Sequence, residues 1–552
     1  MDSRRLLLAA GLSLGVLLLW EWLAPKPARR APVPPPAVTA APSAGAPGSP
    51  ASEASPTTPA SIASTPAAAP APPAAADKET TESIENPVLR ATFSNRGAVL
   101  ASLVLKQYQD EQGRPLELVR TLPAGMPRPF ALEFPGNADA KKKADGALFA
   151  VERVGERALR LHWSDGALSV TKEVSVDAGY LFDVHVAVAG PAFYVLAGPG
   201  LRNPAEHEQV SRYVMPASVV AATSDGLQLM SPLKAKEQAW PLPAKGFAGV
   251  EDNYFLEAFV PHAPSEARVF MYSVPGAGDK PVPVLATGVK GDGRLDGNAY
   301  IGPKDVSILE SYQLNLERTV DFGWYGILAR PLLWMLKKAH SFVGNWGVAI
   351  LLVTFVIRLA LFPLTAKSYS SMKKMQKLTP KMNAIRDKYK KAKTDATQRA
   401  KMNQELMALY QAEGYNPMSG CLPMLLQLPI LVAFYNVLSK TIELRHAPFV
   451  FWIKDLSAID SSYVLVILMI VSMYLQQAMT PSTLDPAQKK IFMFMPVIWG
   501  FFLKDMPSGL VLYWLFSNLL TIVQQLVMNR IVKEDDSSPP PRGAKALKQA
   551  RA

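Results

Sequence analysis

The apolar residues of this 552-residue chain are concentrated in six runs, and this distribution constrains the fold more than any other feature. An α-helix needs about 20 mostly apolar residues to cross the hydrocarbon core of a bilayer. The fifth run is the shortest, and a Pro-Ser-Gly turn signal separates it from the sixth. The pattern predicts an α-helical membrane protein with six spans, at residues 6–23, 344–363, 421–438, 463–479, 491–503 and 507–527.

The composition argues against several other classes of protein. The formal net charge is +12, which is compatible with a nucleic-acid partner, but the basic residues lie next to the apolar runs. Cys421 is the single cysteine, so an intrachain disulfide and a cysteine metal cluster are both excluded. The chain contains neither G-x-x-x-x-G-K-[ST] nor H-E-x-x-H, and its histidines show no ligand-type spacing. We therefore expect no cofactor, no metal and no sequence-specific nucleic-acid partner.

The first apolar run follows Arg4 and Arg5, as in a signal peptide or an uncleaved signal anchor. No small-x-small cleavage site lies close behind it, which favours a transmembrane signal anchor at residues 1–24. Residues 25–84 are mainly Pro, Ala and Ser, with almost no large apolar side chain. Such a segment cannot bury a core, so we predict an extended, disordered tether.

Residues 85–322 change to a period of two. The stretch RALRLHW places Leu159, Leu161 and Trp163 on one face, and a Ser-Asp-Gly turn signal follows it. YLFDVHVAV alternates in the same way, and FSNRGAVLASLVL reads as two strands around an Arg-Gly turn. Many short strands without a membrane-length apolar run predict one large, soluble, antiparallel β-sandwich.

Loop charges predict the orientation, because cytoplasmic loops are enriched in Lys and Arg. Residues 365–416 contain twelve Lys or Arg and four Asp or Glu, a net charge of +8. Residues 443–462 have a net charge of −1, and the segment from 528 to the end is again basic. Six spans then place both termini and the basic tail at 534–552 in the cytoplasm. The β-domain is placed outside, in the periplasm.

The strongly basic segment at 365–416 reads as two amphipathic helices that form a cytoplasmic hairpin. Met and Leu recur at spacings of three to four residues, and Gly414 with Asn416-Pro417 ends the second helix. One interpretation is a docking site for anionic lipids, ribosomal RNA or a targeting factor. The other is a plain topology signal, with the apolar residues joining the two helices. The candidate contact residues are Lys373, Lys374, Lys377, Lys381, Arg386 and Lys388.

Arg358 lies within the second apolar run, where a charged side chain costs about 2.5–3.5 kcal/mol on insertion scales. It is close enough to the cytoplasmic end for its side chain to snorkel to the interface. The spans contain no Asp or Glu that could neutralise it, but they do contain hydroxyls and amides. Such groups often form hydrogen bonds between helices. A water-filled concavity open to the cytoplasm is the second interpretation, with candidate lining residues Thr354, Gln427, Ser472, Gln476, Gln477, Ser517, Asn518, Thr521, Gln524 and Gln525.

Four stretches carry a resemblance to a known family. They read HSFVGNWGVAILLVTFVIRLALFPLTAKSYSSMKKMQKLTPKM, NPMSGCLPMLLQLPIL, FWIKDLSAID and PSGLVLYWLFSNLLTIVQQ. Together they resemble the YidC/Oxa family of membrane insertases, from about residue 324 to residue 530. Upstream, NAYIGPKD, KGFAGVEDNYF and the order of anchor, tether and β-domain are similar to the long, Gram-negative form of the family.

This resemblance implies a non-enzymatic insertase and chaperone of the bacterial inner membrane, with residues 323–533 as a five-span insertase domain. Its clients would be nascent membrane proteins that enter a hydrophilic groove open to the cytoplasm and lipid, with or without the Sec translocon. The hairpin would meet the ribosome or signal-recognition machinery. The groove arginine and threonine of the family match Arg358 and Thr354. The paired tyrosines of its last span match Tyr513 and Trp514, so the second hydroxyl is missing here.

The resemblance also implies that the β-domain is a supersandwich like that of sugar mutarotases, although a shared fold does not bring the activity with it. Two rival functions remain open at this point. A secondary transporter predicts inverted repeats and a membrane-embedded acid, and neither is evident. A tethered carbohydrate-binding or mutarotase-like enzyme would leave the six-span half unexplained.

Overall fold

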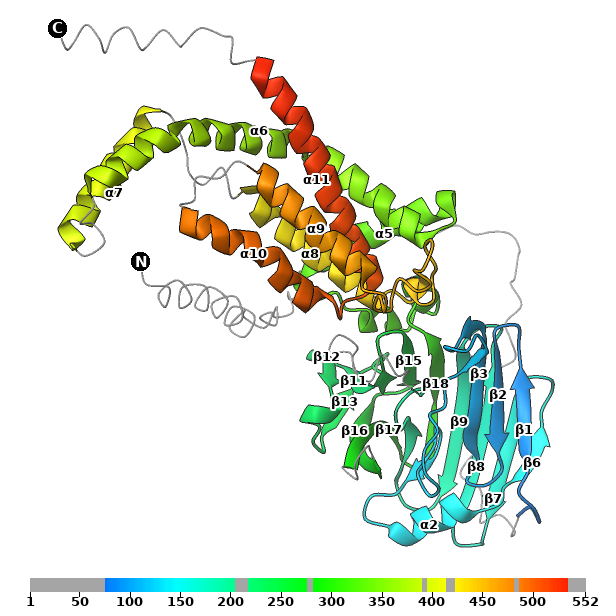
Figure 1. The fold of residues 1–552 in the computed structure, drawn as a ribbon. Helices are drawn as coiled ribbons and strands as arrows, with labels where there is room; N and C mark the ends of the chain where they lie inside the picture. Colours follow the sequence, from blue (N-terminus) through cyan, green and yellow to red (C-terminus); the bar gives the residue numbers. More distant parts are fainter. Residues whose placement is uncertain are drawn as a thin grey trace, which may run out of the picture.

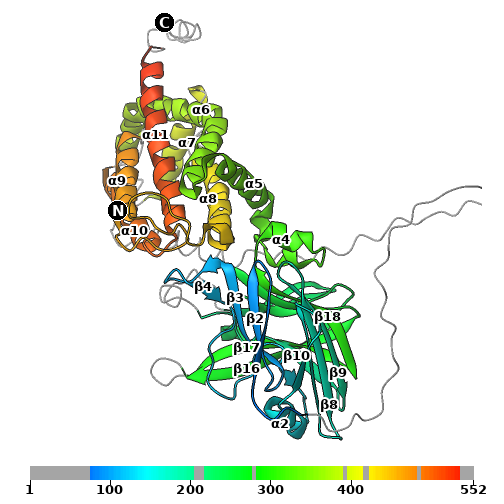
Figure 2. The ribbon, with the colours of Figure 1, turned by 90° about the vertical axis from the view of Figure 1, so that its right-hand side faces the viewer.

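The structure is a computed structural model that describes residues 75–203, 217–275, 281–389, 395–413, 422–480 and 486–534. A β-rich half is followed by a helical half, which lies against one end of it (Figures 1 and 2). The predicted span at 6–23, most of the predicted tether and almost all of the basic tail lie outside the described residues.

The β-rich half contains three antiparallel sheets. The nine-stranded sheet has the order β12 (Gly226–Met230), β11 (Ser218–Thr223), β14 (Ala248–Glu251), β15 (Phe255–Pro261), β18 (Arg294–Pro303), β9 (Leu181–Ala189), β8 (Ser169–Val176), β7 (Ala158–Ser164) and β6 (Ala150–Arg153). The five-stranded sheet has the order β13 (Ala239–Leu242), β16 (Ser265–Pro275), β17 (Pro281–Gly291), β10 (Phe193–Ala197) and β5 (Leu132–Glu133). The four-stranded sheet has the order β1 (Thr81–Glu85), β2 (Leu89–Ser94), β3 (Val99–Gln109) and β4 (Pro115–Glu117).

The sheets pack face to face around a continuous apolar core. Strands β10 and β17 of the five-stranded sheet contact β14 of the nine-stranded sheet. Phe93 of β2 and Phe182 of β9 contact the same ring, that of Phe130, with centroid separations of 6.0 and 6.4 Å. This aromatic contact joins the four-stranded sheet to the nine-stranded one. The predicted sandwich-like, antiparallel arrangement is therefore present.

The period-two prediction is confirmed for β7, β8 and β9, whereas β10, β11, β14 and β15 are buried at every position. In β7, Leu159, Leu161 and Trp163 are buried while the residues between them are partly exposed. β8 and β9 show the same alternation, and the two strands predicted around the Arg-Gly turn are β2 and β3. The boundary with the tether differs from the prediction, because β1 starts at Thr81 and pairs with β2. The polar TESIE sequence offers one buried side chain, Ile84, which is a weak signal for a strand.

A lysine is buried inside this β-rich core. Lys172 lies on the same, buried face of β8 as Val170 and Val174, and it is only 1% exposed. Its Nζ donates to the carbonyl oxygens of Gly97 and Ala98 at 2.9 Å and of Phe130 at 2.8 Å. A protonated amine has three N–H donors, so this arrangement satisfies all of them. The Lys172 side chain thereby ties two loops of the domain to β8, and burial lowers the pKa of its amine to about 7.

The helical half consists of seven main helices. These are α5 (Gly326–Val343), α6 (Trp346–Lys388), α7 (Ala396–Ala412), α8 (Leu422–Lys440), α9 (Val464–Met479), α10 (Pro486–Leu503) and α11 (Ser508–Glu534). α5 is amphipathic, the long helix α6 packs on α7, and α8 to α11 follow. Short helices elsewhere are α2 (Ala138–Gly146), α4 (Val306–Ser311), η1 (Pro232–Lys234), η3 (Leu316–Thr319), η4 (Gly323–Tyr325) and η7 (Ile442–Leu444).

Two findings refine the predicted spans. α6 continues without a break from the predicted second span through the first helix of the predicted hairpin, although Pro363 and Pro380 lie inside it. Within the described residues, α6 and α11 are the two helices long and apolar enough to cross a membrane. α9 and residues Lys490–Leu503 of α10 are apolar too, but they are shorter. The structure therefore shows a helical domain in which two helices are long enough to span a membrane. The count of six spans stays a prediction.

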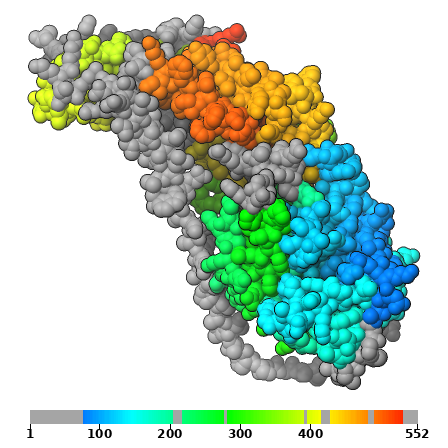
Figure 3. Space-filling view, turned by 60° about the horizontal axis from the view of Figure 1, so that its bottom comes forward, coloured from blue at the N-terminus to red at the C-terminus, as the bar shows by residue number. Residues whose placement is uncertain are grey.

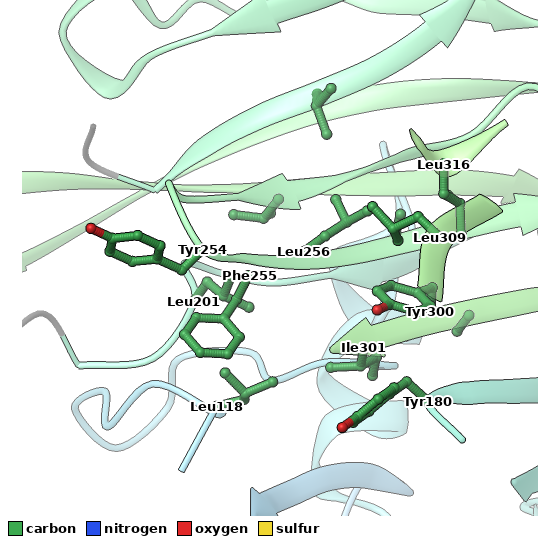
Figure 4. Packing of buried hydrophobic residues seen from close by; sticks show 14 of the residues in the cluster. Leu118, Tyr180, Leu201, Tyr254, Phe255, Leu256, Tyr300, Ile301, Leu309 and Leu316 are labelled. Atoms are coloured by element: carbon green, nitrogen blue, oxygen red, sulfur yellow. The ribbon is translucent and has the colours of Figure 1, made fainter. Parts of the chain in front are cut away.

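The β-rich and helical halves are joined by polar contacts as well as by the chain. After β18, Leu309 of α4 and Leu316 of η3 are buried in the same cluster as Tyr300 (Figure 4). Lys337 of α5 pairs with Asp305 at 3.2 Å and with Glu443 of η7 at 2.6 Å. Lys337 thereby links the middle of α5 to the segment after β18 and to η7, which follows α8.

The start of α6 is also fixed by close packing, and this predicts a stability effect. A Cβ added at Gly347 would overlap the Phe449 ring, whereas a Cβ at Gly326 would meet only Phe322 at 3.9 Å. We expect Gly347→Ala to destabilise the protein by about 1–3 kcal/mol, because overpacking forces neighbours to move. Gly326→Ala is the matched control and should be neutral or slightly stabilising. Thermal unfolding in detergent measures both, and equal midpoints would contradict the packing argument.

Candidate functional site

The helical half buries several polar side chains within its apolar core and exposes many large apolar side chains. The buried polar side chains include Thr354, Ser472, Ser517, Asn518 and Gln525. The exposed surfaces of α9 and α10 are instead large and apolar, with exposed residues Ile467, Leu468, Val471, Leu475, Ile491, Phe492, Phe494, Val497, Ile498, Phe501 and Phe502. A helix bundle in water shows the opposite distribution. The arrangement fits a bundle surrounded by lipid.

α11 is the central helix of this bundle, because four polar and aromatic side chains within six residues of it contact four different helices. Tyr513 contacts α8, Trp514 contacts α10, Ser517 contacts α6 and Asn518 contacts α9. Residues one and four apart on a helix differ in direction by about 100° and 40°, which explains this division. Figures 1 and 2 show α11 passing between α6 and α9.

Arg358 lies on α6 and is directed at α11. Its Nε donates to the hydroxyl oxygen of Ser517 at 3.0 Å, and its terminal nitrogen donates to the same oxygen. The side chain is only partly exposed. Within the part of the chain that the structure describes, Arg358 forms no ion pair with a carboxylate. One neutral hydroxyl cannot neutralise a guanidinium, so most of its five N–H donors remain available.

A second polar contact lies beside the first. Gln427 of α8 donates from Nε2 to the Tyr513 hydroxyl at 2.7 Å. The Tyr513 ring stacks on Phe434 of α8 with a centroid separation of 4.0 Å, which holds the phenol in place. Tyr513 and Ser517 are one turn apart on the same face of α11. The structure thus brings Arg358, Ser517, Tyr513 and Gln427 together across α6, α11 and α8.

The other predicted groove residues are placed differently. Thr354 is buried one turn before Arg358, and its hydroxyl donates to the Ile350 carbonyl at 2.6 Å. Asn518 donates from Nδ2 to the Ser472 hydroxyl at 3.1 Å, so it faces α9 rather than Arg358. Trp514 packs on Trp499 with a centroid separation of 5.7 Å. Asn518 and Trp514 therefore do not line the same space as Arg358.

The contact between α6 and α11 continues beyond Arg358, and sequence reasoning missed this. Gln524 donates to the Thr365 hydroxyl at 2.5 Å, and the Tyr369 hydroxyl donates to Asn529 Oδ1 at 2.9 Å. We call the three pairs Arg358–Ser517, Thr365–Gln524 and Tyr369–Asn529 the polar seam. Thr365 and Tyr369 follow Arg358 by 7 and 11 residues, which places all three on one face of α6. This spacing was the signal that could have revealed the seam.

The outer part of α6 packs against α7 and extends away from the rest of the helical half (Figure 1). Met375, Leu378 and Met382 of α6 and Leu406 of α7 form a separate small apolar core. Of the six predicted contact residues, Lys381 pairs with Glu413 at 2.7 Å and Lys388 pairs with Glu405 at 2.6 Å. Lys373 lies over the Tyr369 ring at 5.9 Å, and Lys374, Lys377 and Arg386 are exposed or partly exposed.

Two family models match the chain. One described as the YidC periplasmic domain matches residues 82–335, and one described as 60Kd inner membrane protein matches residues 338–535. The chain is 33% identical to the membrane protein insertase YidC of Dechloromonas aromatica, with 100% of each sequence covered. It is 35% identical to that of Syntrophus aciditrophicus, with 82% of this chain and 86% of the relative covered. The chain belongs to the YidC family of membrane protein insertases.

A solved structure of the YidC family is also similar. The crystal structure of an active YidC insertase with its first transmembrane domain resolved is 20% identical and has a TM-score of 0.37, with 82% of this chain and 93% of that chain covered. As a member of the YidC family, the protein is a membrane protein insertase of the inner membrane, and this function is not enzymatic. The β-rich half is the periplasmic domain of the family.

Proposed function

We propose that the protein inserts its clients by admitting a hydrophilic segment to a groove at Arg358, on the polar seam. The observation that carries this proposal is a partly buried guanidinium whose hydrogen-bond partner, in the part of the chain described, is the hydroxyl of Ser517. A charge at membrane depth needs water or a counter-ion. An acidic residue in the tail or loop of a nascent membrane protein would supply the counter-ion for a short time.

The direction of the helices supports the predicted six-span topology. From Arg358–Ser517 to Tyr369–Asn529, the residue numbers of the polar seam increase in the same direction along both helices. α6 and α11 therefore run parallel. The positive-inside rule predicts the same, since the second and sixth spans both run from the periplasm to the cytoplasm. We therefore propose that the seam runs toward the cytoplasmic side. Both termini and the α6–α7 pair would lie on that side too.

The insertion step then needs no external energy source. The client's polar segment exchanges part of its hydration for Arg358, Tyr513 and Gln427, which shortens the path it must travel through hydrocarbon. Its apolar segment moves along the exposed apolar faces of α9 and α10 into lipid. Burial of that segment contributes about 25 cal/mol per Å² of apolar surface, which is enough to drive the step for one span.

The α6–α7 pair is proposed as the docking element for the ribosome or a targeting factor and for anionic lipids. Lys374, Lys377 and Arg386 are exposed or partly exposed and present positive charge on α6. Lys381 and Lys388 form ion pairs with Glu413 and Glu405, so we propose that they stabilise the packing of α6 on α7. Cooperation with the Sec translocon is part of the same proposal and rests on the family resemblance.

Cysteine crosslinking tests the groove directly. With Cys421 replaced by Ser, Leu361→Cys places a thiol three residues beyond Arg358 at a partly buried position, and Leu359→Cys places one at a 62% exposed position. A stalled nascent client carrying one cysteine in its hydrophilic tail should form a disulfide with position 361. A cysteine in the client's apolar segment should instead favour position 359. Tail crosslinks that are equal at both positions would refute a groove on this face.

A further inference from the structure

The loop that joins α8 to α9 holds two aromatic side chains outward at the end of a tight turn. The Phe449 amide donates to the Ile453 carbonyl at 3.0 Å, and the Ile453 amide donates to the Val450 carbonyl at 3.2 Å, which closes the turn. Phe451 and Trp452 lie within it, and the Phe451 side chain is 89% exposed. Their rings stack with centroids 6.1 Å apart, so they present one aromatic surface. We call Phe451 and Trp452 the aromatic tip.

The loop is fixed on both sides of the aromatic tip. Before the tip, Arg445 donates from Nη1 to the Gln109 carbonyl of β3 at 2.7 Å, in the region where amber meets blue in Figure 3. After the tip, the Gly509 amide of α11 donates to the Leu456 carbonyl at 2.9 Å. Phe451 has a φ of 55°, a left-handed conformation that is unfavourable for a bulky side chain. A strained aromatic residue held outward between two fixed points indicates that its exposed ring has a function.

The aromatic tip lies level with the start of a membrane-length helix. The Phe449 ring packs on Gly347 in the first turn of α6, and Asn345 Nδ2 donates to the Phe449 carbonyl at 3.2 Å. The exposed apolar face of α6 begins beside this contact at Val348. Phe451 follows Phe449 by two residues, so their Cα atoms lie within about 7 Å of each other. Since the headgroup zone on each side of a bilayer is about 5–8 Å thick, the tip lies at headgroup depth.

The surface around the aromatic tip has the composition of a bilayer interface. Phe342 and Val343, at the end of α5, are exposed apolar residues just before the start of α6. Lys338 lies over the Phe342 ring at 5.3 Å, and the exposed Lys454 directly follows the turn. Aromatic rings settle at headgroup level, and lysine side chains extend from there to the phosphates. Because the exposed apolar face of α6 continues into this surface, one lipid leaflet can cover both.

We propose that the aromatic tip inserts into the headgroup region of one leaflet and anchors the α8–α9 loop to the membrane. Its ligand is phospholipid, which meets the rings with its upper acyl chains and Lys454 with its phosphate. The loop also contacts the first turns of α6 and α11, so the anchor sets the depth of both helices in the bilayer. On the proposed topology this is the outer leaflet, whereas the lipid contact itself depends neither on that orientation nor on the groove at Arg358.

Fluorescence quenching by nitroxide-labelled lipid tests the contact in the full chain, reconstituted in nanodiscs. With Cys421 replaced by Ser, Val450→Cys carries the environment-sensitive fluorophore beside both intact rings. Lys142→Cys is the matched exposed position on α2, at the end of the β-rich half away from the helices (Figures 1 and 2). A nitroxide near the headgroup should quench the label at 450 by about twofold or more, with emission shifted to shorter wavelength, and leave the label at 142 unchanged. Equal, low quenching at both positions would overturn the proposal. A shifted emission without quenching would also overturn it, because a protein would then cover the tip.

Replacing the rings while the label stays at position 450 tests whether they cause the contact. Phe451→Asn combined with Trp452→Gln should lower the quenching at 450 to the level seen at 142. Asn tolerates the left-handed backbone, so the thermal unfolding midpoint in detergent should stay unchanged. Phe451→Tyr combined with Trp452→Tyr keeps two amphipathic rings and should retain the quenching. Undiminished quenching in the variant without rings would show that the tip does not anchor the loop.

Discussion

Replacing Arg358 by Ala should slow the insertion of a client with an acidic tail by about tenfold, which corresponds to about 1.4 kcal/mol. The guanidinium provides the positive charge of the polar seam, and in the described structure its partner is the neutral hydroxyl of Ser517. Two unit charges near a protein surface attract by a few kcal/mol at about 4 Å, so a tenfold effect is a modest share of the available energy. Insertion into proteoliposomes, scored by protease protection of the tail, measures the rate.

The charge dependence of this effect distinguishes attraction from loss of structure. Arg358→Lys retains the charge and should keep most of the activity, although it cannot form the same forked hydrogen bonds. Ser517→Ala removes the neutral partner and leaves the guanidinium free, so it should reduce activity less than Arg358→Ala. A client whose tail acids are changed to Asn or Gln should be affected little. Equal slowing of acidic and neutral tails by Arg358→Ala would rule out charge attraction.

The largest expected effect on stability comes from Lys172→Met in the periplasmic domain. Methionine has a similar length but no donor, so the carbonyls of Gly97, Ala98 and Phe130 would lose the partner they share. Each unsatisfied buried polar group costs about 1–3 kcal/mol, while removal of a buried charge recovers part of that. We expect a net loss of about 3 kcal/mol. Hydrogen exchange in β3 and β8 of the full chain should accelerate accordingly.

Lys142→Met provides the control, because Lys142 is an exposed lysine on α2 of the same domain. Its replacement should change hydrogen exchange in β3 and β8 very little. If Lys172→Met and Lys142→Met gave the same exchange rates, the three carbonyl contacts would contribute nothing to stability. Insertion of clients offers an independent readout of whether the periplasmic domain must be intact for function.

The sequence predicts the class of each half because burial leaves a periodic trace. Leu159, Leu161 and Trp163 alternate because one face of β7 meets the core, and the same rule could have identified Lys172, which replaces an apolar residue in the inward positions of β8. Pro363 suggests a helix boundary, yet α6 continues through it. A proline removes one hydrogen bond, and neighbouring helices in a membrane can compensate for that loss.

The partners of individual side chains could not be predicted in this way. Five polar residues of the last span were candidates to meet Arg358, and only the way the helices cross selects Ser517. Asn518 is its neighbour in sequence but is rotated by about 100° and meets Ser472 instead. Gly347 and Phe449 are far apart in the chain and meet only because the loop after α8 folds back onto the start of α6. Long-range encounters of this kind leave no local pattern.

The continuity of α6 has a mechanical consequence. The same helix carries Arg358 in the bundle and Met375, Leu378 and Met382 in the arm that packs on α7. Pro363, five residues past Arg358, lacks the amide hydrogen that would resist bending there. A force applied to the outer part of α6 would therefore bend the helix next to the guanidinium, so a partner bound to the α6–α7 pair, as proposed above, would shift Arg358 relative to Ser517.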